Sequence, residues 1–255
     1  MNLIVDIGNT RTKIAFFEKN ALVEKAFTNT PSLGWLIQNM GSRQIDGAIL
    51  SATGLDTEGV ETFLTNQFRF VKLDHMTPLP IKNNYATPET LGKDRLAAVA
   101  AANFMFPNQN CLVIDAGTCL TYNFIDANSV FLGGNISPGL TMRLKAMHHF
   151  TAKLPLVELN TDLSSQRHED GSNAWQMFGN STETALRGGA QTGVLAEIDG
   201  FVRFLKQKYK PLTVILTGGD GAFIFKNERF HNLHFEPNLV LKGLNRILNF
   251  NLSFE

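Results

Sequence analysis

The sequence predicts an α/β protein built from two duplicated lobes, each a mixed β-sheet flanked by helices. The segment LIVDIGNTRTKIAFF at residues 3–17 places one aspartate and a glycine turn between two apolar stretches that favour strands. The segment CLVIDAGTCLTYNFI at residues 111–125 repeats this arrangement, and the two aspartates are 115 − 6 = 109 residues apart. The chain has 255 residues and is 44% hydrophobic, which is enough for two cores. We therefore expect internally duplicated lobes over residues 1–109 and 110–255.

The first lobe should contain strands and helices in the order ββ(β)αβαβ, because short apolar runs alternate with helical patterns. The expected strands cover residues 3–8, 12–18, 21–27, 46–53 and 70–74, and the expected helices cover residues 35–40 and 59–68. Residues 77–95, TPLPIKNNYATPETLGKDR, contain prolines, paired asparagines and a glycine that disfavour regular structure. We expect a functional loop there, followed by an alanine-rich helix over residues 95–106.

The second lobe should begin with the strand that starts at residue 111. A strand and a glycine-rich turn are expected over residues 130–140, and a strand, a glycine-rich turn and a helix start over residues 211–223. Helices are expected over residues 140–149, 181–208 and 238–250, with a polar loop near residues 160–172.

Composition excludes several classes of function. Lys plus Arg and Asp plus Glu both number 23, so a nucleic-acid or anionic-membrane surface is not expected. The six histidines do not form a ligand set, and Cys111 and Cys119 lack CxxC spacing, so we expect no zinc site and two reduced thiols. No apolar run of about 18 residues and no signal-peptide progression are present, which favours a cytoplasmic location.

The first carboxylate turn, DIGNT, has the composition of a phosphate-binding loop. Gly8 allows backbone N–H groups to approach an anion closely, and Asp6 at a strand end could hold Mg²⁺. Asn9, Thr10 and Thr12 add neutral donors, while Arg11 or Lys13 could supply charge. An ordinary hairpin with a surface aspartate remains the alternative for this motif considered alone.

The second turn, DAGT at residues 115–118, favours the phosphate interpretation for both copies. Two such turns facing each other across a cleft would grip a polyphosphate, with Asp115 binding a cation and Thr118 contacting phosphate. The glycine-rich turns at 133–139 and 217–221 could line the same cleft, although a plain structural turn is the favoured explanation for each considered alone.

The charged cluster GKDR at residues 92–95 lies at the start of the alanine-rich helix. Asp94 could simply cap that helix, or it could accept a proton from an attacking hydroxyl. Arg95 in a first helical turn opposes the helix dipole, which indicates another role such as binding a carboxylate.

Taken in order, DIGNT, YATPETLGKDR, DAGTCLT, GGNISPGL, NST and TGG resemble the type III pantothenate kinases of the acetate/sugar kinase–Hsc70–actin superfamily. The match runs from residue 6 to about residue 220. It implies two actin-like (ribonuclease H-like) lobes with the active site in the interlobe cleft. The implied activity is ATP-dependent phosphorylation of pantothenate, the first step of coenzyme A biosynthesis, by a homodimer.

The resemblance also implies roles for individual residues. It implies Asp94 as the proton acceptor and Asp115 as the ligand of a monovalent cation, K⁺ or NH₄⁺. The implied ATP-binding residues are Asp6, Ile7, Gly8, Asn9, Thr10, Arg11, Thr12, Lys13 and Thr118, with Asp6 holding Mg²⁺ directly or through water. The implied pantothenate-binding residues are Tyr85, Gly92, Lys93, Asp94, Arg95 and Thr182.

One position departs from the family pattern DxGTxxTxD, because Asn123 stands where the second aspartate is typical. A neutral amide lowers the negative charge of the site, so cation preference is open and position 123 is in doubt as a metal ligand. Two rival functions also stay open. One is another small-molecule kinase of the superfamily, and the other is a non-catalytic nucleotide-binding regulator, which could tolerate loss of GKDR.

Overall fold

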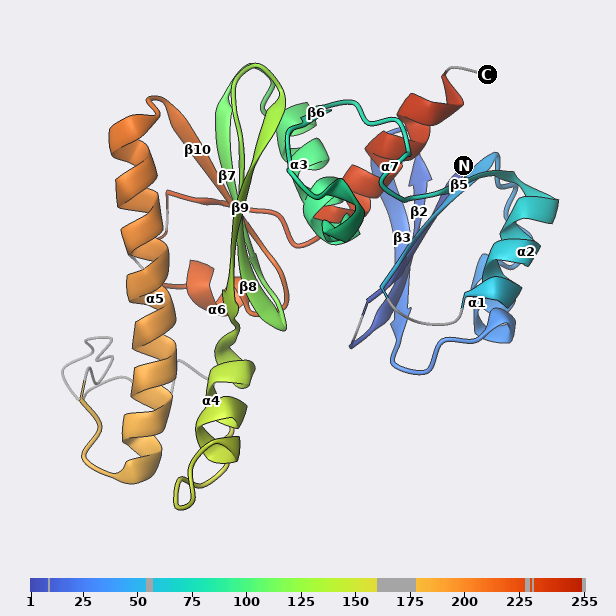
Figure 1. Ribbon diagram of the computed structural model, residues 1–255. Coiled ribbons are helices and arrows are strands. Elements are labelled where there is room, and N and C mark those ends of the chain that lie inside the picture. Colours follow the sequence, from blue (N-terminus) through green and yellow to red (C-terminus); the bar gives the residue numbers. More distant parts are fainter. Residues whose placement is uncertain (9, 54–56, 160–177, 228–229, 231, 254–255) are drawn as a thin grey trace. The chain divides into compact units, whose positions relative to one another are not determined.

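The computed structural model describes residues 1–8, 10–53, 57–159, 178–227, 230 and 232–253. The chain divides into two compact units, which are described separately. Unit 1 comprises Met1–Cys111, Asn123–Gly133 and Asn238–Glu255, and unit 2 comprises Leu112–Tyr122 and Gly134–Pro237. Figure 1 shows sheets with helices packed beside them. Among the described helices, none is both long and apolar enough to cross a membrane.

A five-stranded mixed sheet forms the first part of unit 1, in the order β3-β2-β1-β4-β5. Its strands are β1 (Asn2–Ile7), β2 (Thr12–Glu18), β3 (Ala21–Thr28), β4 (Gly47–Ala52) and β5 (Arg69–Lys72). Strand β1 pairs antiparallel with β2 and parallel with β4, so it is central and all six of its residues are buried. The apolar run Leu3–Val5 within it is typical of a strand that is buried on both faces.

Helices α1 (Leu33–Met40) and α2 (Glu58–Gln67) lie beside this sheet (Figure 1). The Ser32 hydroxyl caps α1 by accepting a hydrogen bond from the Trp35 N–H at 3.1 Å, and Gly41 ends the helix with φ 55°. Leu36 on α1 and Leu64 on α2 pack with β1 and β4 side chains in one apolar cluster.

Helices α3 (Lys93–Met105) and α7 (Leu239–Leu252) pack against each other in unit 1, although they lie far apart in the sequence. The two helix backbones are so close at Gly243 that an added Cβ would lie only 1.8 Å from the Ala97 carbonyl oxygen. Alanines on α3 and a glycine on α7 therefore let the two helix backbones approach each other. The Asn2 amide also donates a buried 2.8 Å hydrogen bond to Asn245, which joins β1 to α7.

The second sheet has six strands in the order β11-β10-β7-β8-β9-β6. Their bounds are β6 (Lys82–Asn83), β7 (Asn110–Ala116), β8 (Cys119–Ile125), β9 (Val130–Pro138), β10 (Leu212–Thr217) and β11 (His234–Phe235). The short strand β6 and a 3₁₀ turn at Pro88–Thr90 lie within the segment predicted to be irregular. Strand β6 forms because it pairs with β9, with Lys82 opposite Val130.

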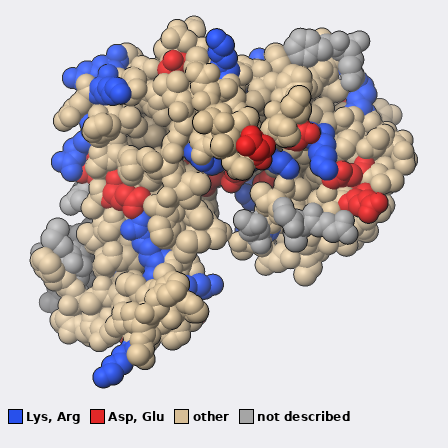
Figure 2. All heavy atoms as spheres, viewed as in Figure 1, with Lys and Arg blue, Asp and Glu red and all other residues tan. Residues whose placement is uncertain are grey.

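Unit 2 also contains α4 (Leu140–His149), α5 (Thr182–Lys208) and the short α6 (Gly221–Phe225). Its apolar cluster joins Leu112 and Ile114 of β7 to Val194 and Ile198 of α5. The polar loop predicted near residues 160–172 lies wholly outside the described part of the chain. Acidic and basic side chains are interspersed on the face of the molecule drawn in Figure 2.

Candidate active site

Asp6 lies near the end of β1, between two strands whose side chains act on its charge. Lys13 on β2 and Ser51 on β4 are its register partners, and the Ser51 side chain hydrogen-bonds the carboxylate. Asp6 is only 8% exposed, and this burial raises its pKa from 3.8 to about 6, with a further rise from the nearby Asp94 charge. Lys13 and Ser51 oppose the rise. A cation beside Asp6 would relieve the cost of ionising it.

The turn after Asp6 closes through its backbone. The Gly8 N–H donates to the Arg11 carbonyl at 3.2 Å, and a Cβ at Gly8 would meet that same oxygen at 3.2 Å. Thr10 and Arg11 are exposed, and the Arg11 guanidinium lies 4.4 Å from the centre of the Phe27 ring. The predicted ligand Asn9 lies outside the described residues.

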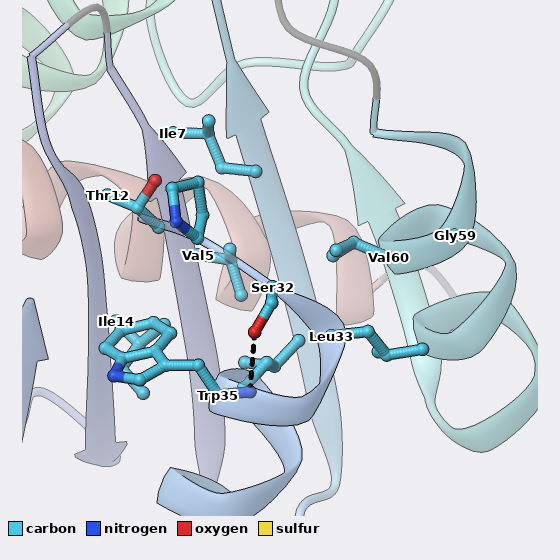
Figure 3. Close-up of a pocket in the computed structure, with 11 residues that line it drawn as sticks. Val5, Ile7, Thr12, Ile14, Ser32, Leu33, Trp35, Gly59 and Val60 are labelled. Carbon is cyan, nitrogen blue, oxygen red and sulfur yellow. Dashed lines mark hydrogen bonds between the residues drawn. The ribbon is translucent and has the colours of Figure 1, made fainter. Parts of the chain in front are cut away.

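The flanking residues of the turn differ in exposure. Ile7 and Thr12 are buried at the ends of β1 and β2, and Lys13 points to the exposed side of β2. A cavity of about 430 Å³ lies beside them, lined by Val5, Ile7, Thr12, Ile14, Pro31, Ser32, Leu33, Trp35, Leu36, Gly59 and Val60 (Figure 3). Its lining is mostly apolar, which does not suit a polyphosphate.

The start of α3 holds the predicted GKDR cluster. Asp94 is exposed, and its Oδ1 accepts a hydrogen bond from the Arg95 N–H at 2.8 Å. A Cβ added at Gly92 would lie 2.5 Å from Asp94 Oδ1, so a larger residue there would displace the Asp94 carboxylate from this position. Lys93 donates from Nζ to the Ala52 carbonyl at 2.9 Å, which ties α3 to the end of β4. Asp94 therefore assists the helix terminus and still presents its carboxylate to solvent.

Arg95 has an unusual environment for a charged side chain. It is 5% exposed, and its Nε donates to Asn123 Oδ1 at 2.6 Å. Its Cζ lies 5.4 Å from the centre of the Tyr85 ring, within cation–π range. Buried Nη2 has no hydrogen-bond partner among the residues that the structure describes. An unpaired buried guanidinium nitrogen is costly, so this group favours an anionic ligand.

Tyr85 is itself held in place by neighbours from β9. Its ring stacks on Phe131 with centroids 6.1 Å apart and planes 8° apart. Gly133 has φ 113° and lies against the same ring, where an added Cβ would be 3.8 Å away. Sequence reasoning missed Phe131 and did not connect Gly133 with Tyr85. The only local signal was the paired glycine in the GGNISPG turn.

The second carboxylate turn lies in unit 2, where Gly139 at the end of β9 and the glycine-rich turn after β10 pack against it. A Cβ on Gly218, which has φ 95°, would lie 2.5 Å from Asp115 Oδ1. A Cβ on Gly139 would lie 2.6 Å from the Thr118 carbonyl oxygen, which accepts the Gly139 N–H at 3.2 Å. Asp115 is half-buried and Thr118 is exposed. Residues 133–138, predicted as a turn, belong to strand β9, because they pair within the sheet. Gly139 after β9 and the turn at 217–221 both meet the 115–118 turn, as two glycines at close approach permit.

Glu197 of α5 organises the surroundings of this turn. Its carboxylate accepts hydrogen bonds from Tyr122 at 3.0 Å and from Ser137 at 2.6 Å, and it pairs with Arg143. Arg143 also donates from Nε to the Pro138 carbonyl at 2.9 Å. Burial raises the pKa of Glu197, but hydrogen bonds from Ser137, Arg143 and Tyr122 outweigh it and leave the pKa lowered. This network joins β8, β9, α4 and α5, and no sequence motif predicted it.

Thr182, the remaining predicted ligand, is exposed as the first residue of α5. Ser181 and Thr184 form a capping box around it, which fixes the helix start. The structure therefore brings Asp6, Lys13, Tyr85, Asp94 and Arg95 into unit 1. Asp115, Thr118 and Thr182 belong to unit 2.

The residues fit the charged groups that a nucleotide site needs. Asp6 is a hard oxygen ligand suited to Mg²⁺, and the half-buried carboxylate of Asp115 is suited to an alkali cation. The described residues contain no cluster of three His, Cys, Asp or Glu side chains that could hold a metal without a bound substrate.

Comparison with known proteins shows the relatives of this chain. A family model described as type III pantothenate kinase matches residues 2–204. A type III pantothenate kinase from Bacteroides fragilis is 46% identical over 253 residues, which is 98% of each chain. A solved Campylobacter jejuni protein, assigned to the Baf family of transcriptional activators, superposes with a TM-score of 0.61 at 23% identity, covering 98% of this chain and 99% of that one.

A second solved structure supports the same fold. The activator of 2-hydroxyisocaproyl-CoA dehydratase from Clostridium difficile superposes with a TM-score of 0.52 at 12% identity, covering 99% of this chain and 94% of that one. These likenesses confirm the predicted actin-like α/β fold.

Proposed function

We infer that this chain, which belongs to the type III pantothenate kinase family, phosphorylates pantothenate with ATP in the first step of coenzyme A biosynthesis. It is a phosphotransferase with an alcohol as acceptor. One observation in the structure carries the proposal: consecutive residues present an exposed carboxylate, Asp94, and a buried guanidinium with an unpartnered nitrogen, Arg95. Pantothenate needs both groups, since it has a hydroxyl to deprotonate and a carboxylate to bind.

The reaction is an in-line transfer of the γ-phosphoryl group to the primary hydroxyl of pantothenate. Such transfers depend on positioning and on neutralising charge. Asp94 accepts the hydroxyl proton, and the Arg95 N–H bonded to Oδ1 at 2.8 Å fixes the direction of its carboxylate. The proton leaves the hydroxyl as its oxygen bonds to phosphorus and the bond to ADP breaks.

Pantothenate is held at its carboxylate by Arg95. Nη2 supplies a charge-assisted hydrogen bond, and the Tyr85 ring covers the guanidinium. Gly92 and Lys93 shape this end of the site, because Gly92 leaves room for the Asp94 carboxylate and Lys93 anchors the helix to β4. Thr182 is a further substrate contact suggested by its family motif.

ATP is held by the first turn, from Asp6 to Lys13, with Thr118 as a further contact from the second turn. Asp6 would hold Mg²⁺ directly or through water, and the ion would neutralise phosphate charge. Asp115 would hold a monovalent cation, K⁺ or NH₄⁺. The proposal further assigns one lobe to residues 1–109 and the other to residues 110–255, with the active site between them. It also assigns the chain to a homodimer and to the cytoplasm.

The proposed base is tested with Asp94→Asn. Loss of a general base costs about 10²–10⁴-fold in rate, so kcat with pantothenate should fall by that range. ATP affinity should stay within about threefold, because the amide keeps the size of the carboxylate and removes only proton acceptance. A coupled ADP-release assay gives kcat, and calorimetry gives nucleotide affinity. Near-normal turnover of the variant would show that another group takes the proton.

The acceptor is tested by comparing pantothenate, pantetheine and several sugars, each with and without K⁺. Turnover with pantothenate, and its increase with K⁺, is the expected result. Turnover with a sugar alone would assign the chain to another kinase activity. Absence of turnover with every acceptor would favour a nucleotide-binding regulator.

A further inference from the structure

Asn123 is a fully buried partner of the candidate substrate site. It lies on β8, is 0% exposed, and accepts a 2.6 Å hydrogen bond from Arg95 Nε. The direction of this bond is fixed, because a guanidinium nitrogen can only donate and the Asn123 oxygen must therefore face it. Position 123 thus serves the arginine through its amide oxygen.

The environment of Arg95 explains why it needs such a partner. The residue stands in the first turn of α3, where a positive charge is unfavourable, and its side chain is buried. Among the described residues, no carboxylate forms an ion pair with it within 4.0 Å. Asn123 fixes Nε and Tyr85 lies over the guanidinium, so its plane is set before a ligand arrives.

A neutral partner also leaves the charge of Arg95 available. The Asn123 amide satisfies Nε without cancelling the positive charge, and Nη2 keeps an unused donor. A ligand carboxylate can then gain a charge-assisted bond to Nη2 without first displacing another anion. Preorganisation of this kind lowers the entropic cost of binding the ligand.

We propose that Asn123 is a positioning residue that sets Arg95 for the carboxylate of the acceptor, and that it thereby determines the preference for a carboxylate-bearing substrate. The proposal rests on the proposed function, because the carboxylate in question is that of pantothenate. Asn123 acts through Arg95, with no contact to the reacting atoms required.

The test measures preference between two acceptors that differ at this end. Pantothenate carries the carboxylate, and pantetheine carries an amide there. Dissociation constants for both are measured by calorimetry, and KM and kcat by ADP release, for wild type and Asn123→Leu. A hydrogen bond to a charged group is lost, so the affinity for pantothenate should fall about tenfold. The affinity for pantetheine and the KM for ATP should change by less than about threefold.

Three further variants separate positioning from a structural role. Asn123→Asp keeps an acceptor for Nε but pairs an anion with Arg95, so its pantothenate affinity should lie between those of wild type and Asn123→Leu. Asn245→Leu is the matched control, since Asn245 is also buried and hydrogen-bonded in unit 1. It should lower thermal stability and leave the acceptor preference unchanged. If Asn123→Leu does not fold, Asn123→Ser, whose hydroxyl is too short to reach Nε, is measured in its place.

A double-mutant cycle identifies the residue through which Asn123 acts. Lysine has no Nε–H, so Asn123→Leu should change pantothenate affinity by less than about twofold in an Arg95→Lys background. Additive effects would overturn the proposal, and so would an unchanged acceptor preference in Asn123→Leu. If wild type neither binds nor phosphorylates pantothenate, the proposed function itself is wrong, which is a distinct outcome.

Discussion

Replacing the buried Asp6 should raise stability while abolishing catalysis. Burial raises the Asp6 pKa from 3.8 to about 6, and one pKa unit corresponds to about 1.36 kcal/mol, so ionisation in the folded state costs about 3 kcal/mol. Because the folded pKa is the higher one, this stability is fully present below pH 3.8 and is lost as pH rises through about 6. Asp6→Asn cannot ionise and avoids the loss.

The prediction is checked by urea unfolding of both proteins between pH 3.5 and pH 8, with EDTA present so that no divalent cation favours the carboxylate. The free energies of unfolding should be nearly equal at pH 3.5. At pH 8 the asparagine variant should be more stable by about 2–3 kcal/mol. Its turnover with Mg²⁺ and ATP should be lost, which serves as the functional control. A difference that stays constant across the pH range, or a less stable variant at pH 8, would refute the reasoning.

Three other predictions concern packing and charge. Gly243→Ala should lower the melting temperature and destabilise unit 1 by about 3 kcal/mol or more, because its Cβ would meet the Ala97 carbonyl oxygen at 1.8 Å. Gly200→Ala, the control inside helix α5, should stabilise by about 0.5–1 kcal/mol, since nothing lies within 4 Å of its Cβ, and a destabilised protein would contradict this. Glu197→Gln weakens the bond to Arg143 and should cost about 2 kcal/mol at pH 7. Since the folded Glu197 pKa is lowered, that cost should shrink as pH falls below 4.5, and a constant cost in pH-dependent denaturation would argue against it.

Local patterns predicted most of the regular structure. Strand β2 at Thr12–Glu18 and helix α4 at Leu140–His149 cover the predicted residues, because alternation and helical periodicity are read within one segment. The two-residue strands β6 and β11 were not predicted. Each exists because the edge of a neighbouring strand accepts it, and two residues carry no periodicity.

In the candidate site, too, the sequence predicted local features but not contacts between distant segments. Asp6 at a strand end and Asp94 at a helix start follow from motifs of a few residues. The partners of these groups do not, because they come from distant parts of the chain. Ser51 reaches Asp6 through the parallel pairing of β1 with β4, and Asn123 reaches Arg95 across 28 residues. At position 123 the sequence raised only the question of a lost cation ligand, whereas the structure shows an acceptor for an arginine.

The packing of α7 on α3 has a consequence for protein synthesis. The alanine face of α3 is complete at Met105, but α7 begins at Leu239, which is 239 − 105 = 134 residues later. At translation speeds of 5–20 residues per second, the ribosome needs roughly 7–27 s to supply the covering helix. During that interval the face of α3 lacks its partner. Alanine presents little apolar area, so the small side chains that allow Gly243 to pack closely also limit the attraction of the nascent chain for other chains.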